Sequence, residues 1–285
     1  MESEKKSASA SDLPWAHLRL PLFPQIAVRV MQLSARENVQ LHQICDLISA
    51  DPAFASEVLT IANSFFYAPR FPAGSIMQVV SVLGATHLQG LCITVAVRAY
   101  LGKSMCLPPM LGLWRHNLAC AIVAQRLATH GFIDKEVAFT AGILHDIGRF
   151  ALAVVQPGEY ASLLEKHGGP PATILDGERE IFGWNHCEAG TQLIADWMLP
   201  SELLPAVCNH HEARRKDGFW NLDELIKMSC RMTDTAGYPA FPGCAVRSYP
   251  DLLEELPARE RRLFYPTVEA LAAEIATGIQ AIESA

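Results

Sequence analysis

The stretch Ala141-Gly-Ile-Leu-His-Asp-Ile-Gly148 decides how this chain folds, because it combines small apolar residues with two adjacent polar ligands. Its first two residues are small, so another helix can approach closely. We expect a helix that begins near Asp134 to end in this stretch, with Gly148 in the left-handed conformation that closes a helix. A carboxylate at a helix C-terminus opposes the helix dipole, which leaves Asp146 poorly explained as a cap. A bound cation beside Asp146 would remove that objection.

Outward from this stretch, the chain carries many helix start signals and few strand signals. Asp51-Pro52 predicts an N-cap followed by proline at the first helical position. Long segments with a 3.6-residue period, joined by short Gly/Pro loops, predict an all-α protein. Four further starts are predicted as capping boxes: Ser75 with Gln78, Thr86 with Gln89, Asn185 with Glu188, and Asn221 with Glu224.

The predicted helices divide the chain into three parts. A soft boundary is expected where Pro108-Pro109 interrupts the helices, and a final amphipathic helix is expected over Pro266–Ile282. The expected division is a disordered N-terminus (1–12), a domain (13–237) with an N-terminal helical lobe (13–105) and a second lobe (106–237), and a C-terminal loop and helix that pack on the domain (238–285).

Composition and charge exclude several classes of function. Hydrophobic residues make up 50% of the chain and charged residues 19%, which excludes a disordered protein. The net charge of −7 opposes the counterion release that drives nucleic-acid binding, so we expect no nucleic-acid partner. The apolar stretch Leu91–Leu101 contains Arg98 and is shorter than the about 20 residues that span a bilayer. We therefore expect a buried helix there and no membrane insertion.

The cysteines and the first residues predict a cytoplasmic location. The eight cysteines contain no C-x-x-C pair, and the segment from Met1 to Ser11 lacks the apolar core of a signal peptide. Reduced thiols that serve as small core residues are the expected state. Cys187 has a second interpretation, because it follows His186 directly and its sulfur is a soft metal ligand. We rank that interpretation below the core role.

Half of the histidines form an ordered series with two aspartates. Imidazole nitrogens and carboxylate oxygens are ligands for iron, manganese, zinc and magnesium. A carboxylate next to a histidine ligand can bridge two ions, an arrangement that activates water against a phosphate ester. The sequence therefore predicts a centre for divalent metal, with two ions. The predicted ligands are His116, His145, Asp146, His186, His210, His211 and Asp234.

Helical spacing predicts where several of these side chains point. His116 lies on an otherwise apolar stripe of the segment 113–127, so its imidazole points inward. A buried histidine needs partners for both nitrogens, and a core histidine bonded to a carbonyl is the alternative to a metal ligand. Asp234 lies in the last turn of the helix capped by Asn221. It is a second acid at the unfavourable end of a helix.

The remaining histidines are expected at two other helix ends. His186 occupies the first turn of the helix capped by Asn185. His210 and His211 close the helix that begins at Ser201. Adjacent residues on a helix diverge by about 100°, so we expect one of the pair to bind metal. The other would face a substrate pocket or a second carboxylate.

These motifs together resemble the HDOD family, the HD-related output domains of bacterial signalling proteins. His116, His145-Asp146 and Asp234 reproduce the H…HD…D pattern of the HD-domain metal-dependent phosphohydrolases, and the resemblance covers roughly residues 14–235. The hallmarks are Leu20-Pro-Leu-Phe-Pro24, Ile48-Ser-Ala-Asp-Pro52, Leu59-Thr-Ile-Ala-Asn-Ser64, Val82-Leu-Gly84, Gly142-Ile-Leu-His-Asp-Ile-Gly-Arg149, Glu178-Arg-Glu-Ile-Phe-Gly183 and His186-x-x-x-Gly190. The resemblance implies an all-helical fold in which an N-terminal subdomain packs on an HD-type bundle.

Two functions follow from the resemblance, and a third is weaker. The first is a regulatory module that contacts a signalling protein partner. The second is a metal-dependent phosphohydrolase that acts on a nucleotide or a cyclic dinucleotide. The third is a di-iron site for redox or gas sensing. The sequence leaves the oligomeric state open.

In the phosphohydrolase hypothesis the site residues have separate roles. Asp146 bridges two ions, one held with His116, His145 and Asp234 and the other with His186 and His210. Arg149 clamps the phosphate, since a guanidinium fork suits phosphate oxygens, or else it is a solvated cation at a helix end. HD-GYP phosphodiesterases carry lysine in place of Arg149, and the Gly-Tyr-Pro signature that follows their paired histidines is missing from that place. Gly237-Tyr238-Pro239 does occur, but it follows Asp234, and we treat it as a coincidence.

Overall fold

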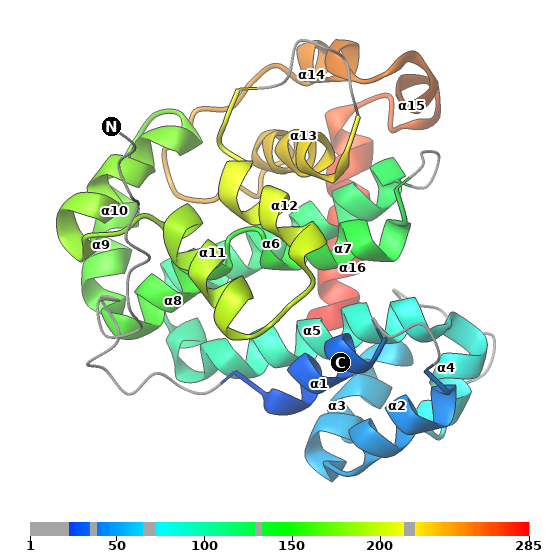
Figure 1. The fold of residues 1–285 in the computed structure, drawn as a ribbon. Coiled ribbons are helices and arrows are strands. Elements are labelled where there is room, and N and C mark those ends of the chain that lie inside the picture. The colour runs from blue at the N-terminus through cyan, green and yellow to red at the C-terminus, as the bar shows by residue number, and fades with distance from the viewer. Residues whose placement is uncertain (1–22, 35–38, 65–71, 129–132, 214–219, 285) are drawn as a thin grey trace, which may run out of the picture.

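The computed structural model describes residues 23–34, 39–64, 72–128, 133–213 and 220–284. Within these ranges all regular secondary structure is helical (Figure 1), which confirms the all-α prediction. An isolated parallel bridge between Gly169 and Cys244 is the β-type pairing found in the same ranges. The predicted disordered segment 1–12 and the first residues of the Leu20–Pro24 motif lie outside them.

The N-terminal helices confirm the predicted caps at Asp51 and Ser75 and correct a third. Asp51 accepts hydrogen bonds from the amides of Ala53 and Phe54 at the start of α3, as expected. The box at Thr86 is wrong, because Gly84, with φ of 90°, caps the next helix and places Thr86 inside its first turn. The helices are α1 (Gln25–Ser34), α2 (Leu41–Ser49), α3 (Pro52–Ala62), α4 (Ile76–Leu83) and α5 (Ala85–Leu101). The buried helix expected at Leu91–Leu101 is the second half of α5.

The remaining helices surround a central pair, α6 and α7. The 3-10 turns lie at Gly102–Cys106, Pro171–Thr173 and Ser201–Leu203. The helices in the middle part of the chain are α6 (Pro108–Ala128), α7 (Lys135–Leu144), α8 (Ile147–Val155), α9 (Pro157–Lys166), α10 (Ile174–Phe182), α11 (His186–Asp196), α12 (Leu204–Asn209) and α13 (Leu222–Thr235). The C-terminal helices are α14 (Tyr249–Glu255), α15 (Ala258–Leu263) and α16 (Val268–Glu283). Pro108 begins α6, and the expected division into lobes stays a prediction.

The central pair packs closely because Gly142 has no side chain. A Cβ atom at this position would overlap the backbone of Ala121 on α6, which explains the close approach that the small residues predict. The segment Lys135–Val155 is apolar and long enough to cross a membrane by composition, but 89% of its apolar window is buried inside the fold. It is therefore part of the protein core.

The helix ends around His145 and Asp146 differ from the prediction. Helix α7 ends at Leu144 and α8 begins at Ile147, so only the His-Asp pair separates them. Gly148 lies inside α8 and its φ is not positive. The reason for a glycine is space, since a Cβ there would collide with the carbonyl oxygen of His186. Asp146 stands at the N-cap of α8, where the helix dipole favours a carboxylate.

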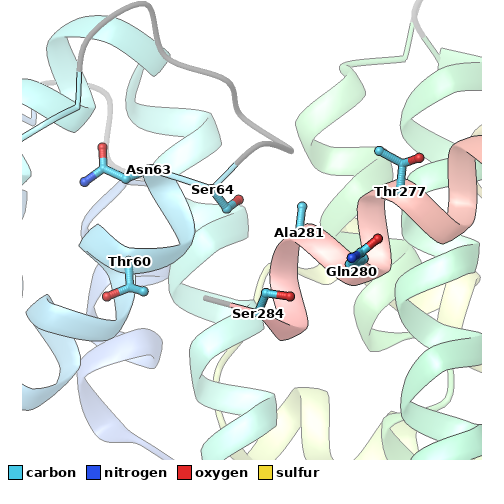
Figure 2. A pocket seen from close by; sticks show the side chains of 7 residues that line it. All are labelled: Thr60, Asn63, Ser64, Thr277, Gln280, Ala281 and Ser284. Atoms are coloured by element: carbon cyan, nitrogen blue, oxygen red, sulfur yellow. The ribbon is translucent and has the colours of Figure 1, made fainter.

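The C-terminal helix crosses the molecule beside α6 (Figure 1). The predicted helix over Pro266–Ile282 is observed as Val268–Glu283. The carboxylate of Glu283 accepts two hydrogen bonds from Arg115 on α6, at 2.8 and 2.9 Å. A cavity of about 600 Å³ separates α16 from the end of α3 (Figure 2). Hydroxyl, amide and methyl side chains line it, so it offers no metal ligand of the predicted kind.

Candidate metal centre

Five imidazole rings from four separate parts of the chain lie in one buried cluster. The ring centroids are 5.4 Å apart for His116 and His145, 5.0 Å for His145 and His210, and 5.3 Å for His186 and His210. His211 lies 4.1 Å from His210 by the same measure. The structure therefore brings all five predicted histidines together.

The outer nitrogen of each of four rings is hydrogen-bonded to a group that can only accept. His116 Nδ1 lies 2.8 Å from the carbonyl oxygen of Tyr238, and His145 Nδ1 lies 2.8 Å from that of Gly142. His210 Nδ1 lies 3.0 Å from the carbonyl oxygen of Val207. In each neutral ring Nδ1 must then carry the proton, because a carbonyl oxygen cannot donate. Nε2 is left with a lone pair.

His186 is fixed in the same tautomer by a buried carboxylate. Glu178 Oε2 lies 2.6 Å from His186 Nδ1 and also accepts a hydrogen bond from the His186 amide at 2.8 Å. The other oxygen of Glu178 accepts a hydrogen bond from the Tyr160 hydroxyl at 2.6 Å. A carboxylate behind a ligand histidine is a common second partner in metal sites. The sequence analysis missed this role of Glu178, although a partner for His186 Nδ1 had to exist.

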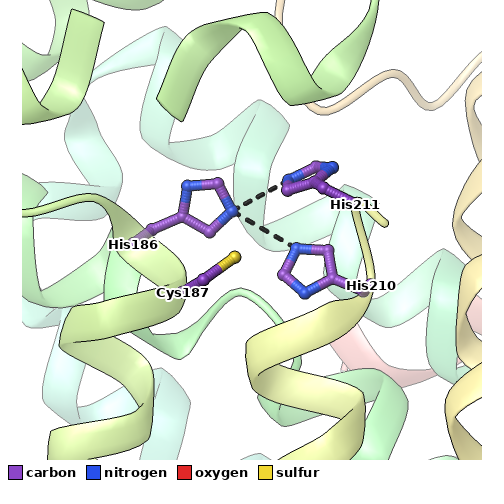
Figure 3. Close-up of side chains that lie close together, drawn as sticks. All are labelled: His186, Cys187, His210 and His211. Carbon is purple, nitrogen blue, oxygen red and sulfur yellow. Dashed lines mark hydrogen bonds between the residues drawn. The ribbon is translucent and has the colours of Figure 1, made fainter. Parts of the chain in front are cut away.

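The Nε2 atoms of three histidines converge on one point (Figure 3). His186 Nε2 lies 3.3 Å from His210 Nε2 and 2.9 Å from His211 Nε2. Two lone-pair nitrogens repel each other, whereas a cation between them would bind both. The expected divergence of His210 and His211 does not occur, because α12 ends at Asn209 and the pair lies beyond it.

Asp146 lies between two groups of imidazoles. Its Oδ1 is 3.2 Å from His210 Nε2 and 3.3 Å from His186 Nε2, and its Oδ2 is 3.5 Å from His145 Nε2. His145 Nε2 is buried and has no hydrogen-bond partner, and the buried Asp146 Oδ1 has none besides its ion pair with Arg149. Such orphaned acceptors are rare in folded proteins. The donor set of imidazole nitrogens and a carboxylate therefore fits a divalent cation.

The protonation states suit ligands. Burial lowers the pKa of His145 to about 3, so its Nε2 lone pair is available at neutral pH. Burial also lowers the pKa of His186 and His211. For Asp146 burial opposes ionisation, but the adjacent Arg149 guanidinium holds the pKa of the carboxyl well below its usual value. His145, His186 and His211 thus present neutral imidazoles, and Asp146 presents an ionised carboxylate.

Arg149 is part of the centre and is not a solvated cation at a helix end. Its side chain is fully buried. The guanidinium places Nε 3.0 Å from Asp146 Oδ1 and an Nη atom 3.2 Å from His211 Nε2. The Phe241 ring lies on its other side, with the centroid 6.0 Å from Cζ. Arg149 therefore supplies one positive charge to a cluster rich in acceptors.

Asp234 is placed beside the centre, behind His116. Its Oδ1 accepts a hydrogen bond from the Ala240 amide at 3.1 Å and lies 3.5 Å from His116 Nδ1. Burial raises the pKa of this carboxyl. Among the described residues, Asp234 does not join the groups of ligand atoms that lie within 4.8 Å of one another. Its role as a ligand stays a prediction.

Cys230 joins His116 and His145 in a group whose ligand atoms lie within 4.8 Å of one another. Its sulfur lies 3.5 Å from His116 Nε2. Sequence reasoning did not select Cys230, but a signal was present. It lies four residues before Asp234 on α13, which places both on the same face of the helix.

A cavity of about 340 Å³ opens beside the cluster. His210, His211 and Asp234 line its inner end, and Lys227, Arg231 and Arg247 are also in its wall. The cations are paired with carboxylates: Lys227 with Asp223 and Glu224, and both arginines with Glu255. Asp146 and Arg149 do not line the cavity.

The segment between α13 and α14 covers the cluster on this side. Phe241 is 2% exposed and also packs against His167, with ring centroids 5.4 Å apart. The Gly169 amide donates to the Gly243 carbonyl, and the Ala245 amide donates to the Gly169 carbonyl, at 3.2 and 2.7 Å. This segment, residues 237–247, is called the cover below. It lies within the C-terminal part that the sequence predicts to pack on the domain.

Comparison with known proteins gives one sequence relative and several similar structures. An uncharacterized protein of Treponema pallidum (strain Nichols) is 26% identical over 217 residues, which are 74% of this chain and 40% of that protein. The chain thus spans about 40% of the length of this relative.

Three solved structures share the fold. An HDOD domain protein of unknown function from Geobacter sulfurreducens is 23% identical with a TM-score of 0.70, covering 93% of this chain and 92% of that one. A candidate signal transduction protein from Marinobacter aquaeolei VT8 is 20% identical with a TM-score of 0.72, covering 94% and 60%. A candidate phosphohydrolase from Shewanella amazonensis SB2B is 22% identical with a TM-score of 0.64, covering 93% and 94%.

The family itself is shown by a match along most of the chain. The model of the HDOD domain matches residues 20–213. This range contains six of the seven predicted ligands, and Asp234 follows it. With its helical fold and its buried histidine cluster, this chain belongs to the HDOD family.

Proposed function

We propose that this protein is a signal-transduction module of the HDOD type, in which a buried metal centre stabilises the fold. The observation that carries this proposal is the burial of Asp146 and of the imidazoles around it, among which His211 is the partly exposed one. His116, His145, His186 and Arg149 are fully buried, and Asp146 is 1% exposed. A phosphate ester cannot contact Asp146 while the cover is in place. The module then acts through its surface, on a signalling protein partner.

We assign two divalent ions to separate positions within the cluster. His186, His210 and Asp146 would hold one divalent ion, with His211 close to it. His116 and His145 would hold a second ion, with Asp146 between the two and Asp234 as a further candidate ligand. A bound ion supplies the positive charge that the lone pairs of this centre lack. Glu178 orients His186, and the three carbonyls orient the other rings.

A second candidate function is a metal-dependent phosphohydrolase acting on a nucleotide or a cyclic dinucleotide. The observation that favours it is the cavity of about 340 Å³ that reaches His210, His211 and Asp234. Its size falls in the usual range for small ligands. Divalent ions would supply activation of water and neutralisation of the phosphate. Arg149 would contact the phosphate only after the cover moves, because Phe241 lies against it.

Metal analysis and a substrate panel separate the two functions. Protein purified without chelator is analysed for metal and is then assayed, with manganese or ferrous iron added. The panel contains cyclic dinucleotides, guanosine tetraphosphate and a chromogenic phosphodiester. Bound metal with no turnover is the expected result. Turnover that Asp146→Ala abolishes would establish the phosphohydrolase instead, and Asp176→Ala, a change at a side chain that is 92% exposed, is the matched control.

A further inference from the structure

We infer that Cys187 is a ligand of this centre, so that His186, Cys187, His210 and His211 form a site for a thiophilic divalent ion such as zinc. The inference rests on the metal centre proposed above and adds the class of metal. It assigns a role to a thiol that the HD ligand pattern does not include.

The four side chains lie close enough together to share one ion, next to Asp146 Oδ1. One ligand atom from each lies within 4.8 Å of the others, and the Cys187 sulfur points toward the gap between His186 and His210 (Figure 3). Around zinc, with Zn–N of about 2.0–2.1 Å and Zn–S of about 2.3 Å, ligand atoms in a tetrahedron are separated by about 3.3–3.6 Å. The observed separations of 3.3 and 2.9 Å between Nε2 atoms are close to this range.

The alternative role of Cys187 is a small residue of the hydrophobic core. It is one of the buried apolar side chains, at 7% exposed, but it does not join the continuous cluster that they form among the described residues. Cys230, the other thiol close to the cluster, does belong to that core. The surroundings of Cys187 are three imidazoles and a cavity of about 260 Å³, whose wall includes Asn185, Glu188 and His211.

A bound ion would convert Cys187 to a thiolate. Burial raises the pKa of this thiol, but coordination to a divalent cation deprotonates a thiol. Cys187 is also the second residue of α11, where the helix dipole favours negative charge. A thiolate beside three imidazoles is a borderline-to-soft donor set. It selects zinc, ferrous iron or cobalt over magnesium and manganese, which prefer oxygen ligands.

Cobalt substitution tests the inference directly. The full chain is treated with chelator, reduced so that Cys187 and Cys208 cannot form a disulfide, and titrated with Co²⁺. We expect visible bands of bound cobalt together with a near-ultraviolet charge-transfer band from thiolate to cobalt. Cys187→Ser is expected to lose the near-ultraviolet band and to keep the visible bands. Cys208→Ser, the matched change at the other thiol of the same cavity, is expected to keep both.

Each other outcome overturns the inference. Cobalt binding without the near-ultraviolet band in the unaltered protein removes Cys187 from the ligands but leaves the metal centre. A near-ultraviolet band that survives Cys187→Ser and disappears in Cys230→Ser would show that Cys230, beside His116 and His145, is the thiolate ligand instead. Failure to bind cobalt at all rejects the proposed centre as well.

Alkylation of the unaltered protein gives a second measurement if Cys187→Ser does not fold. Zinc is expected to protect Cys187 from iodoacetamide, as read by mass spectrometry of its peptide. Cys208 lines the same cavity and serves as the internal reference. Equal modification of Cys187 with and without zinc contradicts the inference.

Discussion

Single side chains in the centre are held as neutral ligands by partners on their outer side. The carbonyls of Gly142, Val207 and Tyr238 each fix one Nδ1 proton, and Glu178 fixes the proton of His186. None of these histidines can take up a second proton without losing its lone pair at the cluster. Acid should therefore weaken both the ligands and the fold.

We expect the free energy of unfolding of the metal-free protein to fall as the pH drops below about 6.5. The pKa of His145 in the folded state is about 3, against 6.5 for an ordinary histidine. Between these values the unfolded chain binds a proton that the folded chain does not, so stability is lost with falling pH. The slope from this group is up to about 1.4 kcal/mol per pH unit. Urea titrations at several pH values between 4 and 8 would measure it, and a flat profile would contradict the assignment.

We expect Glu178→Gln to weaken metal binding by about 10- to 100-fold, because it removes the carboxylate behind His186. A competition titration against a chromophoric chelator gives the affinity. Glu188→Gln, on a side chain that is 43% exposed, controls for the change of residue type, and Tyr160→Phe removes only the hydroxyl that Glu178 accepts. Unchanged affinity in Glu178→Gln would show that the carboxylate does not orient the ligand.

The residue types of the centre could be predicted from the sequence, but which side chains contact each other within it could not. Histidine and aspartate at these positions indicate metal ligands by their chemistry alone. Whether Asp234 or Cys230 faces His116 Nε2 depends on how α13 rotates against α6, and one helical turn separates the two candidates. That rotation is set by packing along the whole helix.

At the scale of helices, the fold depends on two close approaches made by glycine. Gly142 lets α7 lie against α6, and Gly148 lets α8 lie against the start of α11. The second contact matters for the site, because it sets the distance between Asp146, which caps α8, and His186, which begins α11. Side chains at either glycine would separate the ligands.

We expect Gly142→Ala to destabilise the protein by about 3 kcal/mol, since the new methyl group overlaps the backbone of Ala121. Gly112→Ala is the matched control in the neighbouring helix, where a Cβ meets nothing within 4 Å. That change should stabilise the helix by about 0.5–1 kcal/mol. Chemical denaturation measures both variants, and equal stability of the two would refute the packing argument.

Helix starts were predictable where the signal is local. Asp51, Asn185 and Asn221 cap their helices with their own side chains, as the sequence indicates. The failures at Thr86 and Gly148 have different causes. Gly84, with φ of 90°, takes the cap position that was expected at Thr86, whereas Gly148 leaves room for the carbonyl oxygen of His186, a tertiary contact that no short sequence pattern shows.

At the scale of the whole molecule, the cover decides what reaches the centre. Its Phe241 lies between Arg149 and the imidazole of His167. The sequence predicted an ordered loop that packs on the domain, but its position over the cluster depends on contacts between residues more than 70 positions apart. The predicted division into lobes stays untested.

We expect Phe241→Ala to speed the removal of bound metal by an external chelator, because the ring that fills the space above Arg149 is lost. Val246→Ala, on the same segment but 57% exposed, should leave the rate unchanged. Stopped-flow measurements with a chromophoric chelator give both rates. If the two variants behave alike, access does not run through the cover.

The short bridge at Gly169 also affects how long a bound metal ion would stay in the centre. Two backbone hydrogen bonds join the cover to the segment before α10, a small number compared with those inside a helix. Such an edge opens locally long before the protein unfolds. The residence time of a metal ion and the amide exchange of Ala245 would then report the same opening, and should change together when the bridge is altered.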